Sequence, residues 1–117
     1  MLVKYKKTFE KIAMGLISLM PKCKDSKYLM DIVHHYEQAT DRQLYLWKKD
    51  EEFVGIIGVA VEGSTATIQH ISILPSYHGE GITAAMLEEL RALGQYDSLQ
   101  YNDETAPFLQ HHLSNKE

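Results

Sequence analysis

The chain has 117 residues, of which 44% are hydrophobic and 24% are charged, a composition ordinary for a globular domain with one core. Its net charge of −4 argues against a nucleic-acid-binding protein, because such proteins concentrate basic residues on one face. The basic residues gather in positions 1–49, where they form either a solvated helix surface or a contact for an anionic partner. The single cysteine, Cys23, excludes an internal disulfide and fits a reducing cytoplasm.

The first part of the chain predicts a short strand over residues 1–5 and two amphipathic helices. Thr8 can cap the first helix, whose apolar residues recur at helical spacing until Pro21. Ser26 can cap the second helix, whose apolar side extends to Tyr36. No apolar segment is long enough to span a bilayer and no signal peptide is apparent, so we expect a cytoplasmic protein without membrane contact.

The middle of the chain predicts three consecutive strands, over residues 43–49, 53–61 and 65–74. The turns between them are short, which favours an antiparallel meander. Gly55 and Gly58 lie inside the second strand, where glycine often marks a bend or a close backbone approach.

A glycine-rich turn joins the third of these strands to a helix that begins near Ile82 and ends near Gly94. The start of a helix leaves backbone N–H groups unpaired, and glycine lets an anion approach them closely. The turn is therefore a candidate cradle for a phosphate, although a strand–helix turn also needs glycine for its geometry alone. Its spacing fits neither a dinucleotide-binding fingerprint nor a P-loop.

A short strand over residues 98–101 and a last helix complete the pattern. Asp103 or Thr105 can cap this helix, and Pro107 suits its first turn. The predicted order of elements is β-α-α-β-β-β-α-β-α, which indicates a mixed α/β (α+β) fold. Because no linker, repeat or low-complexity segment is apparent, we expect residues 1–117 to form one domain.

The run ILPSYHGEGIT, residues 73–83, resembles the acyl-CoA loop of the GNAT family of N-acetyltransferases. That loop has the pattern Arg/Gln-x-x-Gly-x-Gly/Ala, and here Gly81 matches the first glycine, whereas His78 and Thr83 depart from the pattern. The runs YKKTFEKIAMGLISLMP and TDRQLYLWKKDE resemble small acetyltransferase-like members encoded in riboflavin operons of Gram-positive bacteria. Together these similarities cover nearly the whole chain.

This resemblance implies a mixed, mostly antiparallel sheet that lacks the family's usual last two strands. It also implies an N-acetyltransferase that binds acetyl-CoA and acetylates an unidentified amine, with a link to riboflavin metabolism and no metal. The alternative is a non-catalytic protein, either an acyl-CoA-binding regulator or a structural partner of riboflavin-pathway enzymes. Without those strands, either a partner chain supplies the missing wall of the acceptor site or the site is open. The exposed edge of the sheet favours homodimerisation, because proteins generally cover such edges.

The resemblance also assigns the cofactor-binding residues. The backbone of Ile71, Ser72 and Ile73 is expected to pair with the pantetheine arm, and the loop N–H groups to hold the pyrophosphate. His78 lacks the permanent charge of arginine, and the carboxylate of Glu80 is expected to weaken binding. The remaining expected contacts are Tyr77, His78, Gly79, Glu80, Gly81, Ile82, Thr83, Asn102 and Phe108.

Catalysis requires a base for the amine and an acid for the leaving thiolate. The family commonly uses a tyrosine on the last helix as the acid, but Leu109 holds that position here, which leaves Tyr101 or Tyr77 as a substitute. His70 is the first candidate base and Glu62 the second, although the pattern favours an exposed or packed side chain over a catalytic one for each. The adjacent pairs His34–His35 and His111–His112 lack metal-ligand spacing, so we expect no metal site.

Overall fold

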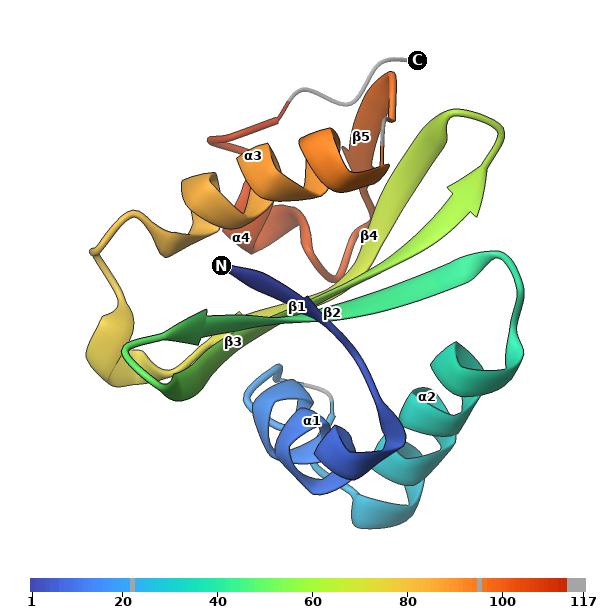
Figure 1. Cartoon of the computed structure of the whole chain (residues 1–117), viewed down its shortest axis with the longest axis vertical. Coiled ribbons are helices and arrows are strands. Elements are labelled where there is room, and N and C mark those ends of the chain that lie inside the picture. The colour runs from blue at the N-terminus through green and yellow to red at the C-terminus, as the bar shows by residue number, and fades with distance from the viewer. Residues whose placement is uncertain (22, 95, 114–117) are drawn as a thin grey trace.

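The computed structural model describes residues 1–21, 23–94 and 96–113. Five strands form one sheet in the order β1-β2-β3-β4-β5, and neighbouring strands are antiparallel except for the parallel pair β4–β5 (Figure 1). The predicted mixed fold with a mostly antiparallel sheet is confirmed. In chain order the elements are β1 (Leu2–Lys4), η1 (Lys7–Phe9), α1 (Glu10–Ile17), α2 (Ser26–Gln38), β2 (Arg42–Lys49), β3 (Glu52–Glu62), β4 (Thr65–Ile73), η2 (Pro75–Tyr77), α3 (Ile82–Gly94), β5 (Ser98–Tyr101) and α4 (Ala106–Leu109).

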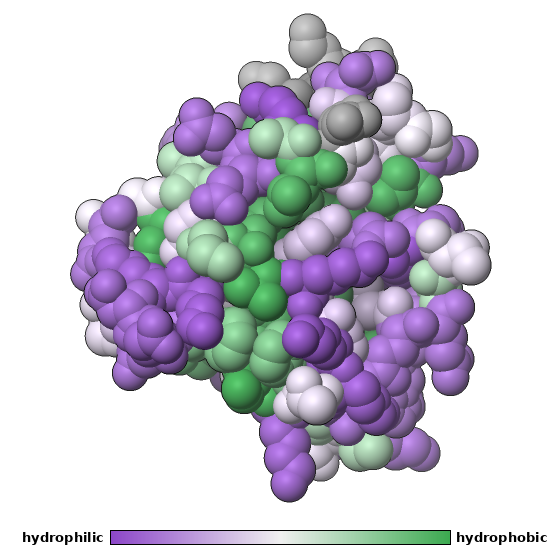
Figure 2. Space-filling view, in the orientation of Figure 1, coloured by the Kyte–Doolittle hydropathy of each residue, from purple (hydrophilic) through white to green (hydrophobic). Residues whose placement is uncertain are grey.

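Helices cover both faces of the sheet, so the apolar core has two halves. Helices α1 and α2 lie on one face, whereas α3 and α4 lie on the other (Figure 1). Leu46 and Ile56 pack under α1 and α2, and Ile57 and Ile71 pack under α3. Figure 2 shows hydrophobic residues in a band across the middle of one face, bordered by hydrophilic side chains. None of the helices in the described part of the chain is long and apolar enough to cross a bilayer.

Two helix starts differ from the predictions. Thr8 lies inside the 3-10 turn η1 and does not cap α1, which begins at Glu10. The cap of α2 is Asp25, whose carboxylate accepts a hydrogen bond from the Lys27 N–H at 3.0 Å, and Ser26 is the first helical residue. Aspartate and serine cap helices about equally well, so local sequence could not choose between neighbouring positions.

Strand β4 carries an irregularity next to His70. Gly58 of β3 lies opposite His70, but the next residue, Val59, lies opposite Ile68. Gln69 is therefore an extra residue on β4, the arrangement of a β-bulge. Beyond this point β4 also loses its other neighbour, because its pairing with β5 ends at Ile68 opposite Tyr101.

The turn after β5 explains why the two strands separate. Asn102 and Thr105 bond each other reciprocally, since the Asn102 N–H donates to Thr105 Oγ1 at 3.1 Å and the Thr105 N–H donates to Asn102 Oδ1 at 2.9 Å. The buried Thr105 hydroxyl also donates to the Ile68 carbonyl at 3.0 Å. This side chain takes the acceptor that a longer β5 would have used, so the sheet opens beside residues 69–73 of β4.

Candidate functional site

The opening beside β4 continues into a cavity of about 460 Å³. Its walls are the exposed edge of β4, the glycine-rich loop, the start of α3, the end of the α1 segment and α4. Among the expected cofactor contacts, Glu80 and Asn102 do not line it. The lining residues are Leu19, Ile71, Ser72, Ile73, Pro75, Tyr77, His78, Gly79, Gly81, Ile82, Thr83, Ala84, Phe108 and His112.

The loop needs glycine for backbone geometry rather than for space. Gly79 and Gly81 have φ angles of +84° and +78°, in the region that side chains disfavour, although a Cβ at either position would meet no atom within 4 Å. Helix α3 starts immediately afterwards, with the Ala85 N–H donating to the Gly81 carbonyl at 3.1 Å. The first N–H groups of this helix have no intrahelical acceptors, and its first residues line the cavity, so its walls offer donors to an anion.

The edge of β4 supplies backbone groups from alternate residues. The Leu74 N–H donates to the Val54 carbonyl at 2.8 Å, so Leu74 faces β3. Because backbone groups alternate along a strand, those of Ile71 and Ile73 point to the open side. The Ile73 carbonyl oxygen lies 2.9 Å from His78 Nε2, which occupies part of this edge.

Two of the expected contacts use their side chains elsewhere. The Ser72 hydroxyl donates to the Leu16 carbonyl on the opposite face of the sheet, so its side chain is committed to the α1 layer. Asn102 Nδ2 donates to Gln69 Oε1 at 3.2 Å, which places Asn102 at the point where β4 and β5 separate. Both residues shape the opening without offering a side chain to the cavity.

His70 lies on the α2 side of the sheet, in a second cavity of about 310 Å³. Only 9% of its surface is exposed, and its Nδ1 lies 2.6 Å from the Tyr36 hydroxyl. Burial, with a smaller contribution from the nearby Arg42, lowers the pKa of His70 to about 4. The imidazole is therefore neutral at pH 7. The lining residues are Tyr28, Asp31, Ile32, His35, Tyr36, Arg42, Gln69, His70 and Glu104.

The Tyr36–His70 contact depends on a glycine. A Cβ on Gly58 would overlap the Tyr36 hydroxyl, so glycine at this position lets the ring lie against β3 beside His70. This is the close approach that glycine inside a predicted strand indicated. Burial raises the pKa of Tyr36 well above its usual value, so the hydroxyl stays protonated at the surface of the second cavity.

The other predicted catalytic residues are not brought to His70. Glu62 is an exposed residue at the far end of β3, opposite Thr65, and lines neither cavity. Tyr101 is the last residue of β5, beside Ile68 at the edge of the opening. Leu109 is fully buried in the core under α3, so the position that usually carries a tyrosine faces away from solvent.

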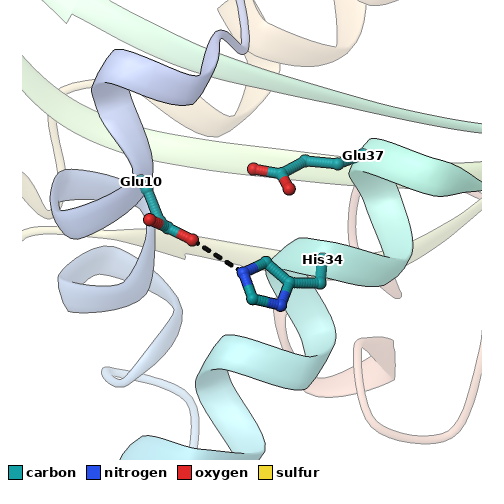
Figure 3. A group of neighbouring side chains, drawn as sticks. All are labelled: Glu10, His34 and Glu37. Atoms are coloured by element: carbon teal, nitrogen blue, oxygen red, sulfur yellow. Dashed lines mark hydrogen bonds and ion pairs between the residues drawn. The ribbon is translucent and has the colours of Figure 1, made fainter.

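One histidine and two carboxylates form a separate group between α1 and α2 (Figure 3). Among the described residues, Glu10, His34 and Glu37 are the one set of three whose ligand atoms all lie within 4.8 Å of one another. Lys7 bridges both carboxylates, at 3.1 Å from Glu10 and 3.5 Å from Glu37, and the Tyr5 hydroxyl donates to Glu37 at 2.6 Å. These bonds satisfy the group as an ion-pair network between α1 and α2. The absence of a metal stays a prediction.

Three residues that the fold brings to the site were not predicted as site residues, namely Tyr36, Arg42 and Thr105. Asn102 and Thr105 have the spacing of a capping box, and this was the available signal for the turn after β5. Tyr36 and Arg42 had no local signal, because they meet His70 only through the packing of α2 on the sheet.

Two comparisons with known protein sequences indicate the same family. The sequence profile of the acetyltransferase (GNAT) family matches residues 13–103. A relative from Bacillus methanolicus, described as an uncharacterized N-acetyltransferase in the lysA 3′ region, is 46% identical over 111 residues, which are 94% of this chain and 92% of the relative.

Solved structures show the same fold at low identity. The aminoglycoside N-acetyltransferase AAC(6')-Iy in complex with CoA superposes with a TM-score of 0.80 at 12% identity, covering 100% of this chain and 89% of that one. The ribosomal-protein-alanine N-acetyltransferase of Brucella melitensis gives a TM-score of 0.73 at 14% identity, covering 100% and 92%. These two likenesses concern the fold alone.

Proposed function

Since the chain belongs to the acetyltransferase (GNAT) family, we propose that it binds acetyl-CoA in the 460 Å³ cavity and transfers the acetyl group to an amine. The observation that carries this proposal is the continuity of that cavity. It joins the unpaired edge of β4 to the start of α3, two sets of backbone groups that suit different parts of one cofactor.

The backbone of Ile71 and Ile73 suits the amide groups of the pantetheine arm, which can pair with β4 as another strand would. The loop and the first turn of α3 suit the pyrophosphate. Both rely on main-chain groups, so the departures at His78 and Thr83 remove none of them. His78 must release the Ile73 carbonyl if the arm uses that acceptor.

The acceptor amine is proposed to reach the thioester from the α2 side, where His70 lies. The amine attacks the thioester carbonyl, the C–N bond forms, and the C–S bond breaks to release CoA thiolate. With Nδ1–H donating to the Tyr36 oxygen, the Nε2 lone pair of His70 can accept the proton that the amine loses. An N–H at the Gln69 bulge is proposed to stabilise the oxyanion.

The thiolate must then be protonated without the usual tyrosine. Tyr101 is the proposed donor on the last strand, and water is the other source. The buried Leu109 favours a second candidate function, an acyl-CoA-binding regulator or partner of riboflavin-pathway enzymes with no turnover.

We propose further that the protein corresponds to RibT, the acetyltransferase-like protein of riboflavin operons, and acts in the cytoplasm on a flavin-related amine or a pathway protein. The similarity of its N-terminal runs to such proteins supports this link. Within the described residues β5 is an edge strand of four residues, which supports a proposed homodimer. Sedimentation velocity tests the dimer independently of activity.

The proposed function is tested in two steps. Calorimetry with acetyl-CoA and CoA should give a saturable heat, and mass spectrometry should detect acetylated product from a panel of flavin-related and other primary amines. Saturable heat without product from any amine would favour the non-catalytic candidate. No heat and no chemical-shift change with millimolar acetyl-CoA would contradict both the acetyltransferase and the acyl-CoA-binding regulator, and would leave the structural partner.

A further inference from the structure

The β2–β3 hairpin contacts the glycine-rich loop at two residues, Tyr77 and Glu80. Lys49, the last residue of β2, places its Nζ 2.5 Å from Glu80 Oε1. The same ammonium lies 5.7 Å from the centroid of the ring of Tyr77, which lines the 460 Å³ cavity. The hydrogen bond to Glu80 raises the pKa of Lys49, so the side chain stays charged.

The hairpin presents this lysine through a tight turn. Asp50 and Glu51 have φ angles of 51° and 70°, which reverse the chain within two residues. The residue after the turn, Glu52, accepts a hydrogen bond from the Tyr77 hydroxyl at 2.9 Å. The hairpin therefore contacts the loop at Tyr77 and at Glu80, which brings the Lys49 ammonium close to the cavity wall.

Lys49 offsets the negative charge of Glu80 at this loop. Glu80 stands between the two glycines whose backbone must meet an anionic ligand, and a bare carboxylate there would repel phosphate. His78 supplies no permanent charge, and its Nε2 is engaged with the Ile73 carbonyl. Among the described residues, Lys49 is the only cationic side chain hydrogen bonded to residues 75–81.

We propose that Lys49 is the phosphate-binding cation of the acyl-CoA site, held in place by Glu80 in the free protein and transferred to the cofactor's phosphates on binding. This inference rests on the proposed function, because it assumes that the cavity takes acyl-CoA. A diphosphate carries more negative charge than one carboxylate, so it can compete with Glu80 for the ammonium. Both Lys49 and Glu80 are partly exposed, with 37% and 42% of their side-chain surface accessible, which leaves the ammonium free to move.

The role has a simpler rival, in which Lys49 only neutralises Glu80. The two roles separate when Glu80 is removed. If Lys49 only neutralises the carboxylate, then Lys49→Met has no effect on CoA affinity in a Glu80→Gln background. If Lys49 binds phosphate, the same change weakens CoA binding in that background too.

The experiment is calorimetry at low salt on wild type, Glu80→Gln, Lys49→Met/Glu80→Gln, and Lys48→Met. Lys48 is a matched control, because it is the neighbouring lysine and its Nζ lies over the Phe53 ring. We expect the double variant to bind CoA about five- to tenfold more weakly than Glu80→Gln, a size typical of a partly exposed charge-assisted bond. Lys48→Met should stay within about twofold of wild type.

Binding of CoA, dephospho-CoA and pantetheine is compared to identify the phosphate that Lys49 contacts. Pantetheine lacks all phosphates and should bind the two Glu80→Gln proteins equally, whereas a loss seen with CoA but not with dephospho-CoA would assign Lys49 to the 3′-phosphate. The difference between the two proteins should shrink as NaCl is added. Equal CoA affinity in Glu80→Gln and the double variant overturns this inference alone, and no CoA binding by wild type overturns it together with the proposed function.

Discussion

The two cavities that residues of β4 line are built in different ways. The cavity on the α3 side is lined mostly by residues 71–84, and what it offers a ligand is largely backbone. The cavity on the α2 side is lined by side chains from separate elements, including Tyr36 of α2, Arg42 of β2 and Glu104 after β5. The cavity on the α3 side is therefore built mostly from one continuous segment, whereas the cavity on the α2 side is built from residues far apart in the sequence.

This difference predicts what each cavity tolerates. Backbone donors survive most side-chain changes, so a cofactor held by them can be retained when loop residues such as His78 and Thr83 depart from the family pattern. A pocket of side chains changes its specificity with each substitution. We therefore expect family membership to identify the cofactor, whereas the acceptor is set by residues such as Asp31, Arg42 and Glu104.

The sharpest test of the backbone-built cavity is Gly81→Val. Gly81 has a φ of +78°, which a β-branched residue adopts only with strain, so the loop must change shape and withdraw its N–H groups. We expect acetyl-CoA binding to fall below detection in calorimetry, while circular dichroism shows an intact fold. Gly63→Val is the matched control, since Gly63 has a φ of +62° in the β3–β4 turn away from the cavity. Retained binding in Gly81→Val would contradict a pyrophosphate at this loop.

The side-chain-built cavity is tested by His70→Gln. This change keeps hydrogen-bonding capacity but removes the ability to take a proton, and a general base typically contributes 10²–10⁴-fold. Because the lowered pKa of about 4 makes His70 a weak base, we expect a loss near the lower end, about 10²-fold in turnover, with unchanged acetyl-CoA affinity.

His34→Gln controls for the exchange itself, because His34 contacts Glu10 on another side of α2. Turnover per folded molecule that matches wild type in His70→Gln would remove His70 from the mechanism. Its role would then be packing against Tyr36, which a lowered melting temperature would report.

The same contrast explains how far the sequence predicts this structure. Strands β2, β3, β4 and β5 and helix α3 agree with the predicted ranges to within a residue, because their apolar periodicity matches the faces they bury. The loop at 77–83 was predictable because its function depends on local backbone geometry. The start of α2 shifted because two cap-forming residues, Asp25 and Ser26, are neighbours. The start of α1 shifted because the 3-10 turn η1, which contains Thr8, precedes it.

The remaining site contacts join residues far apart in sequence. Tyr36 and His70 are separated by 34 positions, and Lys49 and Glu80 by 31. No local pattern marks either pair, since each depends on how α2 or the β2–β3 hairpin packs. Gly58 was an indirect sign that some group approaches β3 closely. A glycine in a strand does not identify that group, which is the Tyr36 side chain.

The lowered pKa of His70 also predicts an effect on stability, separate from turnover, that sharpens the same comparison. The folded chain keeps this group neutral down to about pH 4, whereas the unfolded chain protonates it below its ordinary pKa of 6.5. Stability from this group is therefore complete above pH 6.5 and is lost as the pH falls towards 4. The shift corresponds to roughly 3 kcal/mol of unfolding free energy.

Urea unfolding of wild type and His70→Gln between pH 7 and pH 4 measures this contribution. Carboxylates titrate in the same range, so the informative quantity is the difference between the two proteins, from which common terms cancel. We expect wild type to lose up to roughly 3 kcal/mol more than His70→Gln over this range. Parallel curves would mean that His70 is not held neutral by its surroundings, which include Asp31, His35, Arg42 and Glu104.

The smallest expected effect belongs to a side chain at the edge of the backbone-built cavity. His78→Arg introduces a permanent charge near the expected pyrophosphate and releases the Ile73 carbonyl. We expect acetyl-CoA affinity to improve by about 0.5–1 kcal/mol at low salt, the scale of an exposed charge near a helix start.

His78→Gln separates the two parts of this effect. It also removes the ring from the Ile73 carbonyl, but it adds no charge, so any gain that it shares with His78→Arg comes from freeing the edge of β4. The part due to charge appears only in His78→Arg and declines as salt is added. Because the N–H groups of the loop and of α3 are present in all three proteins, none should lose binding altogether. A large loss in His78→Gln would instead mean that this side chain, and not the backbone, carries the affinity of the cavity.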